Sequence, residues 1–306
     1  RSVDGVEKDY FYNVNLGTSL ANKTDRWQAA TFVDHTFGGG VEFFSDVVLY
    51  RARSILGRTP VGTDATDEPN IAVAVNNPYN PFGIALTTLS ARTNFGPVRK
   101  FDTESTNANF LAGLRGTVLG KWDWESAVSY GFSNVATVSR NAIRATVYQA
   151  ALNGTTRATA FNPFGYTFKV AGNAIVPDQP YTNPQSVLDT VVLKWRHDGL
   201  SAITSFDARA SGPIFRYWGN TVSLATGAEY RHEQYLDLRP AYVGSNPPGV
   251  GLAENDNDYL VASYAPNSTG NRIVYSGYVE TIIPVFSPQR KIPLLYSLEL
   301  TGSARY

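Results

Sequence analysis

The stretch FLAGLRGTVLGKWDWESAVSYGF, residues 110–132, decides the fold class. It divides into two runs joined at Gly120-Lys121, and apolar residues recur at every second position in both runs. The second run alternates aromatic side chains such as Trp124 with charged ones such as Glu125. A period of two places alternate side chains on opposite faces of a strand. The stretch therefore predicts an antiparallel hairpin with one aromatic face and one charged face.

A sheet with these two faces is typical of a transmembrane β-barrel, in which the apolar face contacts lipid and the polar face lines the lumen. The fold class predicted here is all-β, as a part of such a barrel with long extracellular loops. We expect residues 1–306 to form one segment, incomplete at both ends, because the sequence begins at Arg1, contains no Met and shows no signal peptide. No composition shift marks a domain boundary.

Composition excludes several classes of protein. The 306 residues include 26 acidic and 26 basic side chains and no cysteine. A nucleic-acid partner is not expected, because such a surface needs clustered basic charge. Disulfides and zinc-thiolate sites are excluded by the lack of cysteine. No apolar run reaches the roughly eighteen residues of a transmembrane helix.

Alternation along the rest of the chain predicts about nine strands. Short turns are expected at 38–40, 120–121, 216–220 and 287–293, and mostly long connections between the other strand ends. The predicted strands are Asp9–Leu20, Arg26–Phe37, Val41–Ser54, 101–119, Trp122–Arg140, Leu200–Phe215, Thr221–Gln234, Ile273–Phe286 and Leu294–Tyr306.

Two helices are predicted within the longest connection, 141–199. The first covers Ala142–Leu152. The second covers Pro184–Trp195, where Asn183 can cap the helix and apolar residues recur with helical spacing. The β-rich run DTVVLKW makes a strand the alternative for this second segment. We favour the helix because it keeps every long loop on one side of the sheet.

Several phrases resemble the barrels of TonB-dependent outer-membrane receptors. The resemblance extends over most of the chain and rests on strand patterns. The matching phrases are GLRGTVLGKWDWESAVSYG (113–131), GNTVSLATGAEYRHE (219–233), YSGYVETIIPV (275–285), LELTGSARY (298–306), NPYNPFG (77–83) and FNPFG (161–165). The sequence departs from the family because it contains no plug domain and no TonB box, and because a complete barrel there has more than roughly twenty strands.

The resemblance implies a transport protein of the bacterial outer membrane rather than an enzyme. Its expected activity is TonB-energised import of a scarce, bulky ligand such as an iron chelate, a corrinoid or an oligosaccharide. Its partners would be the TonB complex, reached through a plug, the lipid of the outer membrane, and the ligand. No cofactor is implied. The alternatives are a passive porin-like channel and a structural or adhesive barrel, and a soluble β-sandwich enzyme ranks last.

Two sets of residues are candidates for function. Aromatic and amide side chains in the long loops suit ligand binding, although they equally suit loops that pack on one another. These candidates are Tyr166, Tyr181, Tyr242, Asn255, Asn257, Tyr259 and Tyr264. The phrases NPYNPFG and FNPFG are open between ligand contact and ordinary turn chemistry.

The second set consists of charged residues that fall in the polar phase of the strands. They are predicted to face the lumen and to pair with one another and with a plug, in preference to forming a ligand path. This set is Arg115, Asp123, Glu125, Glu229, Arg231, Glu280, Glu299 and Arg305. No catalytic or metal site is predicted, because the three histidines are far apart in sequence and no nucleophile elbow or phosphate-binding loop is present.

Overall fold

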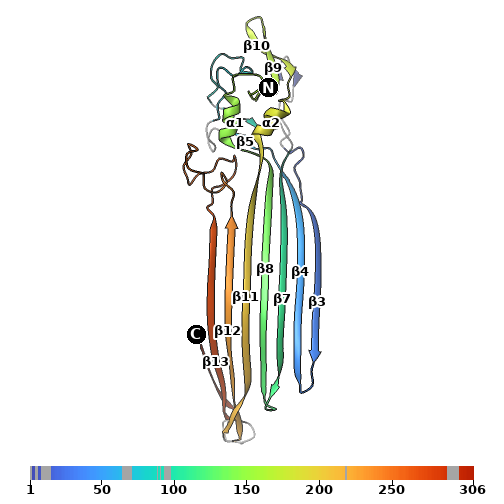
Figure 1. Ribbon diagram of the computed structural model, residues 1–306, viewed down its shortest axis with the longest axis vertical. Coiled ribbons are helices and arrows are strands. Elements are labelled where there is room, and N and C mark those ends of the chain that lie inside the picture. Colours follow the sequence, from blue (N-terminus) through green and yellow to red (C-terminus); the bar gives the residue numbers. More distant parts are fainter. Residues whose placement is uncertain are drawn as a thin grey trace.

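The computed structural model describes residues 2–3, 6–7, 15–63, 71–87, 89, 91–92, 98–217, 219–287 and 296–306. These residues form one long antiparallel sheet with two short helices beyond one end (Figure 1), which confirms the all-β prediction. The strands of this sheet are β3 (Lys23–Thr36), β4 (Val41–Arg58), β7 (Arg99–Val118), β8 (Trp122–Ile143), β11 (Val192–Tyr217), β12 (Asn220–Leu238), β13 (Ser268–Phe286) and β14 (Leu298–Arg305).

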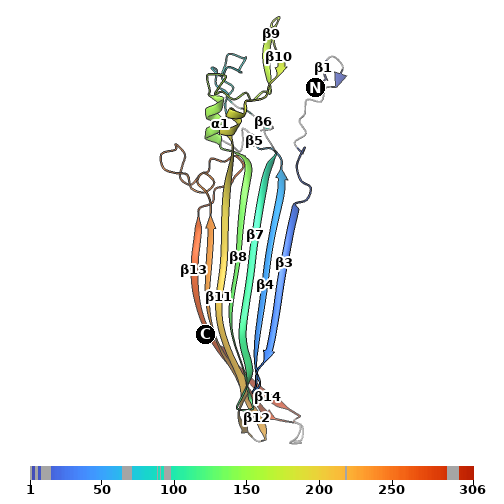
Figure 2. The same cartoon turned by 45° about the vertical axis from the view of Figure 1, so that its right-hand side comes forward.

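The eight strands lie in the order β14-β13-β12-β11-β8-β7-β4-β3, so neighbours in the sheet follow one another along the chain. The sheet is open in the part of the chain that the structure describes, because β3 pairs only with β4 and β14 pairs only with β13. Figure 2 shows the strands running side by side, with the helices and long loops at one end and the short turns at the other.

The long loops carry the smaller elements. They are β5 (Gly62–Thr63), β6 (Ala91–Arg92), α1 (Ala145–Leu152), β9 (Tyr166–Ala171), β10 (Ala174–Pro180) and α2 (Gln185–Val191), and two N-terminal strands, β1 (Ser2–Val3) and β2 (Val6–Glu7), pair with each other. The hairpin β9–β10 projects farthest from the sheet (Figure 1). The predicted first helix is confirmed by α1, although it begins three residues later than expected.

The hairpin between β7 and β8 turns one residue earlier than predicted. Its two central residues are Leu119 and Gly120, with φ of 55° and 65°. The Lys121 amide donates to the Val118 carbonyl at 3.2 Å, which closes the turn. Two consecutive positive φ values match the right-handed twist of the flanking strands. Glycine adopts this conformation freely, whereas leucine at the first position does so at an energetic cost.

The predicted helix Pro184–Trp195 is partly wrong. Helix α2 ends at Val191, and β11 begins at Val192 and pairs Leu193 with Ala142 of β8. The β-branched and aromatic residues after Val191 prefer the sheet, where they find a partner strand. Strand β11 then continues without a break, so the expectation that all long loops lie on one side is still met.

The first predicted strand, Asp9–Leu20, is not found in the described residues. Residues 9–14 lie outside them, and residues 15–20 form a turn and an irregular segment. The sheet therefore has eight strands where nine were predicted, and its described edge is β3. Strands β4, β8 and β12 also run three or four residues farther toward the loops than predicted, and β7, β11 and β13 begin two, eight and five residues earlier than predicted. The long connections are therefore shortened to 59–98, 144–191 and 239–267.

The three long connections pack on one another, and we call them together the loop cap. Their main hydrophobic core lies beyond the sheet end and combines Val73 from the first loop, Tyr148 and Leu152 from α1, Val191 from α2, and Leu260 from the third loop. All five side chains are buried. The loops therefore form a folded layer above the strands.

Candidate functional site

The register of the sheet separates its residues into two faces. Residues directly opposite one another in an antiparallel pair share a face. Val128 of β8 is opposite Ala112 of β7 and Phe206 of β11, whereas Ser129 is opposite Leu111 and Ser205. We call the face of Val128 the apolar face and the face of Ser129 the polar face.

The apolar face carries large hydrophobic side chains that are exposed. Examples are Phe110 at 39%, Val128 at 49% and Tyr275 at 70% exposure. On β8 this face is apolar or uncharged from Trp122 to Phe132, a span of eleven residues. A tilted strand needs about 9–11 residues to cross the hydrocarbon core of a bilayer. The apolar face thus has the length and the chemistry of a lipid-facing surface.

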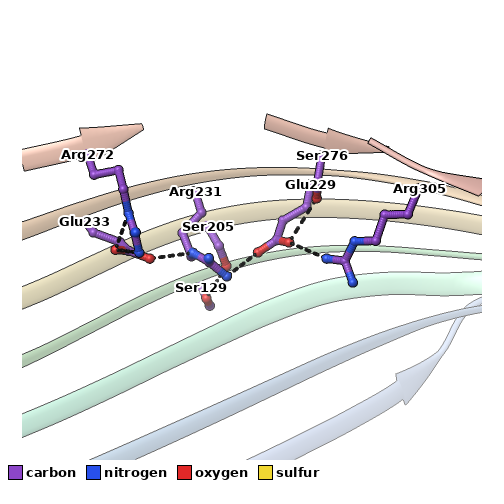
Figure 3. Close-up of polar contacts among 8 residues, drawn as sticks. All are labelled: Ser129, Ser205, Glu229, Arg231, Glu233, Arg272, Ser276 and Arg305. Atoms are coloured by element: carbon purple, nitrogen blue, oxygen red, sulfur yellow. Dashed lines mark hydrogen bonds and ion pairs between the residues drawn. The ribbon is translucent and has the colours of Figure 1, made fainter. Parts of the chain in front are cut away.

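The polar face holds the charged residues. All eight of the predicted lumen-facing residues lie on it, as their register positions show. Figure 3 shows one chain of contacts across β12, β13 and β14. Arg231 Nη1 lies 3.0 Å from Glu229 Oε1 and Arg231 Nε lies 2.7 Å from Glu233 Oε1. Arg272 pairs with Glu233 at 2.5 Å, and Arg305 reaches Glu229 at 3.9 Å.

A second group of charges lies on the same face closer to the short turns. Arg115 pairs with Glu42 at 2.5 Å, and Arg209 pairs with Glu125 at 2.8 Å. These four residues border a cavity of about 560 Å³ that also contacts Asp123. Ion pairs between neighbouring strands fix the orientation of these side chains, so the face presents both signs of charge in a set pattern. Such a surface suits water, polar ligands or a charged protein segment.

The described residues contain no cluster of histidines and no candidate metal site. His197 contacts Asp237 on the polar face near the loop cap, while His35 and His232 lie on other strands. No group of three metal-ligating side chains occurs among the residues that the structure describes. In the same part of the chain, no helix is both long and apolar enough to cross a membrane.

The asparagines of the two NPFG-containing phrases have a structural role. Asn77 Nδ2 donates to the carbonyls of Leu152 and Phe161 at 2.9 and 3.0 Å, and so satisfies the C-terminal end of α1. Asn162 and Asn183 exchange side-chain and backbone hydrogen bonds at 2.8 and 2.9 Å. Buried amides with all these partners hold the loops together. For these asparagines, the structure favours turn and packing chemistry over ligand contact.

Asp258 is a buried residue that sequence reasoning missed. Its carboxylate accepts from the Thr146 amide at 2.8 Å, the Thr146 hydroxyl at 2.5 Å and Arg144 Nε at 2.7 Å. Its carbonyl accepts from the Ala145 amide at 2.7 Å. Arg144 is the N-cap residue of α1 and makes no side-chain capping bond, so Asp258 supplies the cap from another loop. No local motif marks this aspartate, because its partners are more than one hundred residues away.

The seven predicted ligand-binding residues divide between packing and exposure. Tyr259 is 7% exposed, and the Arg144 guanidinium lies 3.5 Å from the Tyr242 ring centre. The hydroxyls of Tyr181 and Tyr79 meet at 2.5 Å, and Asn257 donates to the Ala262 carbonyl. These four candidates therefore hold the cap together. The three that remain exposed are Tyr166, Asn255 and Tyr264.

An aromatic patch forms where the two NPFG phrases meet. The ring centres of Phe82 and Phe164 are 6.3 Å apart, and Phe168 of β9 lies 6.1 and 5.4 Å from them. Phe82 is 45% exposed, and Tyr166 beside the patch is 46% exposed. This patch is the aromatic surface of the loop cap best placed to meet a ligand from solution, because aromatic pairs form flat, rigid contact areas.

Burial raises the pKa of Tyr79 to about 12, and its hydrogen bond with Tyr181 adds to the shift. A raised pKa means that the folded state favours the neutral Tyr79 hydroxyl. The stability that this hydroxyl contributes to the loop cap is therefore complete below pH 10 and is lost as the pH rises toward 12. We expect the tyrosinate absorbance of the Tyr79→Phe variant, subtracted from that of the wild type, to rise near pH 12. A difference curve centred near the ordinary value of 10 would contradict the buried placement of this hydroxyl.

Comparisons with known proteins identify no family. No protein-family model matches the sequence, and no curated protein matches it. A solved structure described as the structure of the RagAB peptide transporter matches with a TM-score of 0.35 and 12% identity, over 85% of this chain and 25% of that chain. This chain thus spans about a quarter of the length of that one.

Proposed function

We propose that this chain is part of the wall of an outer-membrane β-barrel that imports a bulky ligand with energy from a TonB-type system. The observation that carries the proposal is the two-faced sheet. One face exposes aromatic and aliphatic side chains over the thickness of a hydrocarbon core, and the opposite face holds a network of ion pairs. In this orientation the polar face lines the lumen.

The loop cap supports a receptor role within this proposal. Three loops at one end of the strands share a hydrophobic core and buried hydrogen bonds, so they form a preorganised surface. Preorganised sites bind with a smaller loss of conformational entropy than disordered loops do. The aromatic patch around Phe82 and Phe164 and the exposed Tyr166 are the proposed first contacts for the ligand.

The test is uptake by Gram-negative cells that produce the full-length protein. Labelled ferric chelate, corrinoid and oligosaccharide are offered separately, with and without a functional TonB complex and with and without a protonophore. We expect one class of probe to accumulate only when TonB and the proton gradient are both present. Entry of the probe to equilibrium without TonB or the proton gradient would replace this proposal by a passive channel. Recovery of the protein outside the membrane fraction would overturn the barrel itself.

Excision of 145–191 is expected to abolish uptake while the protein still assembles in the membrane. This segment contains α1, α2 and the β9–β10 hairpin, whereas residues 142–143 of β8 and 192–199 of β11 pair in the sheet and must be kept. Heat-modifiable migration of the folded barrel on gels measures assembly, and the accumulation of labelled ligand measures function. Unchanged uptake would place the ligand site on other loops or on a plug.

A further inference from the structure

We propose that a row of charged residues on the apolar face binds the phosphate groups of anionic membrane lipid in the leaflet next to the loop cap. We call this row the basic belt. The proposal rests on the proposed function, which places the apolar face against lipid. The members of the belt are Lys23, Asp25, Arg51, Arg53, Lys100, Asp102, Glu104, Arg140, Lys194, Arg196 and Asp198.

The register places these residues together on one face of five neighbouring strands. Arg53 is opposite both Asp25 and Glu104, and Lys100 is opposite Arg140, which is opposite Lys194. The belt contains seven cationic and four anionic side chains, so it carries three more positive than negative charges. The whole chain, by contrast, has a formal net charge of zero.

Three of the four acidic members of the belt, Asp102, Glu104 and Asp198, form ion pairs with its arginines. Arg53 contacts Asp102 at 2.6 Å, Arg140 reaches the same carboxylate at 3.7 Å, and Arg196 contacts Asp198 at 2.7 Å. Asp102 is 13% exposed, while the side chains of all three arginines remain more than half exposed.

The arginines therefore keep donors that face outward, and guanidinium groups bind phosphate through paired N–H bonds. The excess charge comes from the lysines of the belt. Lys23, Lys100 and Lys194 are exposed, and none of them forms an ion pair with an acidic residue among the residues that the structure describes.

The position of the belt identifies its partner as lipid. On β7 the apolar face changes from Phe110 and Ala108 through Thr106 to Glu104, and the belt begins there. The strands continue beyond the apolar span, since β8 alone has 22 residues. The belt therefore borders the hydrocarbon-facing surface on the side of the loop cap. Headgroup phosphates lie at this depth in a bilayer, and clusters of Lys and Arg beside a membrane surface attract anionic lipid.

Trp27 provides a reporter at this boundary. It lies on β3 directly opposite Arg51, on the apolar face, and is 53% exposed. The full-length protein, with Trp27 as its one remaining tryptophan, is reconstituted in phosphatidylcholine vesicles. A small fraction of either brominated phosphatidylglycerol or brominated phosphatidylcholine is then included. Bromine quenches tryptophan on contact, so the ratio of the two quenching signals measures local enrichment of the anionic lipid.

We expect phosphatidylglycerol to be enriched roughly fivefold at Trp27 at low salt, the effect of about one effective basic residue at a membrane surface. High salt should reduce the enrichment. The variant Lys23→Gln, Lys100→Gln, Lys194→Gln should lose it. A matched variant is Lys121→Gln, Lys169→Gln, Arg216→Gln, which removes three positive charges away from the belt and should keep the enrichment.

The outcomes separate this proposal from the proposed function. Quenching by neither lipid would show that the apolar face does not contact a bilayer, and the proposed function would fail. Equal quenching by both lipids would leave the membrane placement intact and overturn the basic belt. Native mass spectrometry of the wild-type protein with the same two lipids, unbrominated, gives a second measurement that needs no tryptophan substitutions, and equal retention of both would also overturn the belt.

Discussion

Replacing Asp258 by alanine is expected to detach the third loop, 239–267, from helix α1 while the eight-stranded sheet remains folded. The buried carboxylate accepts three hydrogen bonds, and its removal leaves Arg144 and the Thr146 amide without those partners. Breaking a buried ion pair costs about 3–5 kcal/mol. We expect about 3 kcal/mol here, the low end of that range, because the Arg144 side chain is 20% exposed and keeps some access to water.

The effect should be local because the contacts of Asp258 are local to the loop cap. Hydrogen exchange should accelerate in α1 and around Leu260, whose amide bonds the Ile143 carbonyl, and it should stay slow in β7 and β8. Glu254→Ala is the matched control, since Glu254 is an exposed carboxylate on the same loop. Equal exchange in wild type and Asp258→Ala would mean that the cap is held by its hydrophobic core alone.

Helix α1 explains why the loss of Asp258 is expected to affect the whole loop cap. The helix has eight residues, which is too short to be stable alone in water. Asp258 from the third loop accepts from its first two amides, and Asn77 from the first loop donates to its last carbonyl, that of Leu152. Tyr148 and Leu152 of the helix enter the shared core. The three loops are therefore coupled through α1. Loss of the hydrogen bonds at either end of this helix should loosen all three loops.

The sheet was predictable from sequence because its signals are local. Alternation along 110–132, and glycines such as Gly39 that adopt positive φ at the short turns, depend only on neighbouring residues. The end of α2 was mispredicted because the run DTVVLKW combines helical spacing of its apolar residues with residue types that prefer strands. Pairing with β8 decided between the two. Local patterns do not contain that information.

The loop-cap residues were less predictable for a related reason. Tyr166 and Tyr259 look alike in sequence, yet one is 46% exposed and the other 7%. Their difference comes from contacts between loops that are distant along the chain, such as the bridge between Arg144 and Tyr259. Composition identified the loops as rich in candidate ligand contacts. It did not show which of these side chains pack against other loops, and no sequence feature indicated the role of Asp258.

Val128→Arg should impair membrane insertion far more than Ile203→Arg. Both residues are exposed aliphatic side chains in long central strands, at 49% and 43% exposure. Val128 lies on the apolar face near the middle of the Trp122–Phe132 span. Ile203 lies on the polar face, where its cross-strand partner is Glu233. The same substitution therefore places a guanidinium against lipid in one variant and beside a carboxylate in the other.

An arginine on the lipid-facing side costs about 2–4 kcal/mol at the bilayer midplane, which corresponds to a roughly 30- to 900-fold loss in the folding equilibrium. The full-length protein is folded into phosphatidylcholine bilayers across a denaturant series, and the folded fraction gives the free energy of each variant. Ile203→Arg should stay close to wild type, because an arginine there faces water and can pair with Glu233. If both substitutions reduce the free energy of folding equally, the two faces contact the same kind of environment, and the sheet does not separate lipid from a lumen. If Ile203→Arg is the damaging change, the apolar face is the one exposed to water, and the orientation proposed for the wall is reversed.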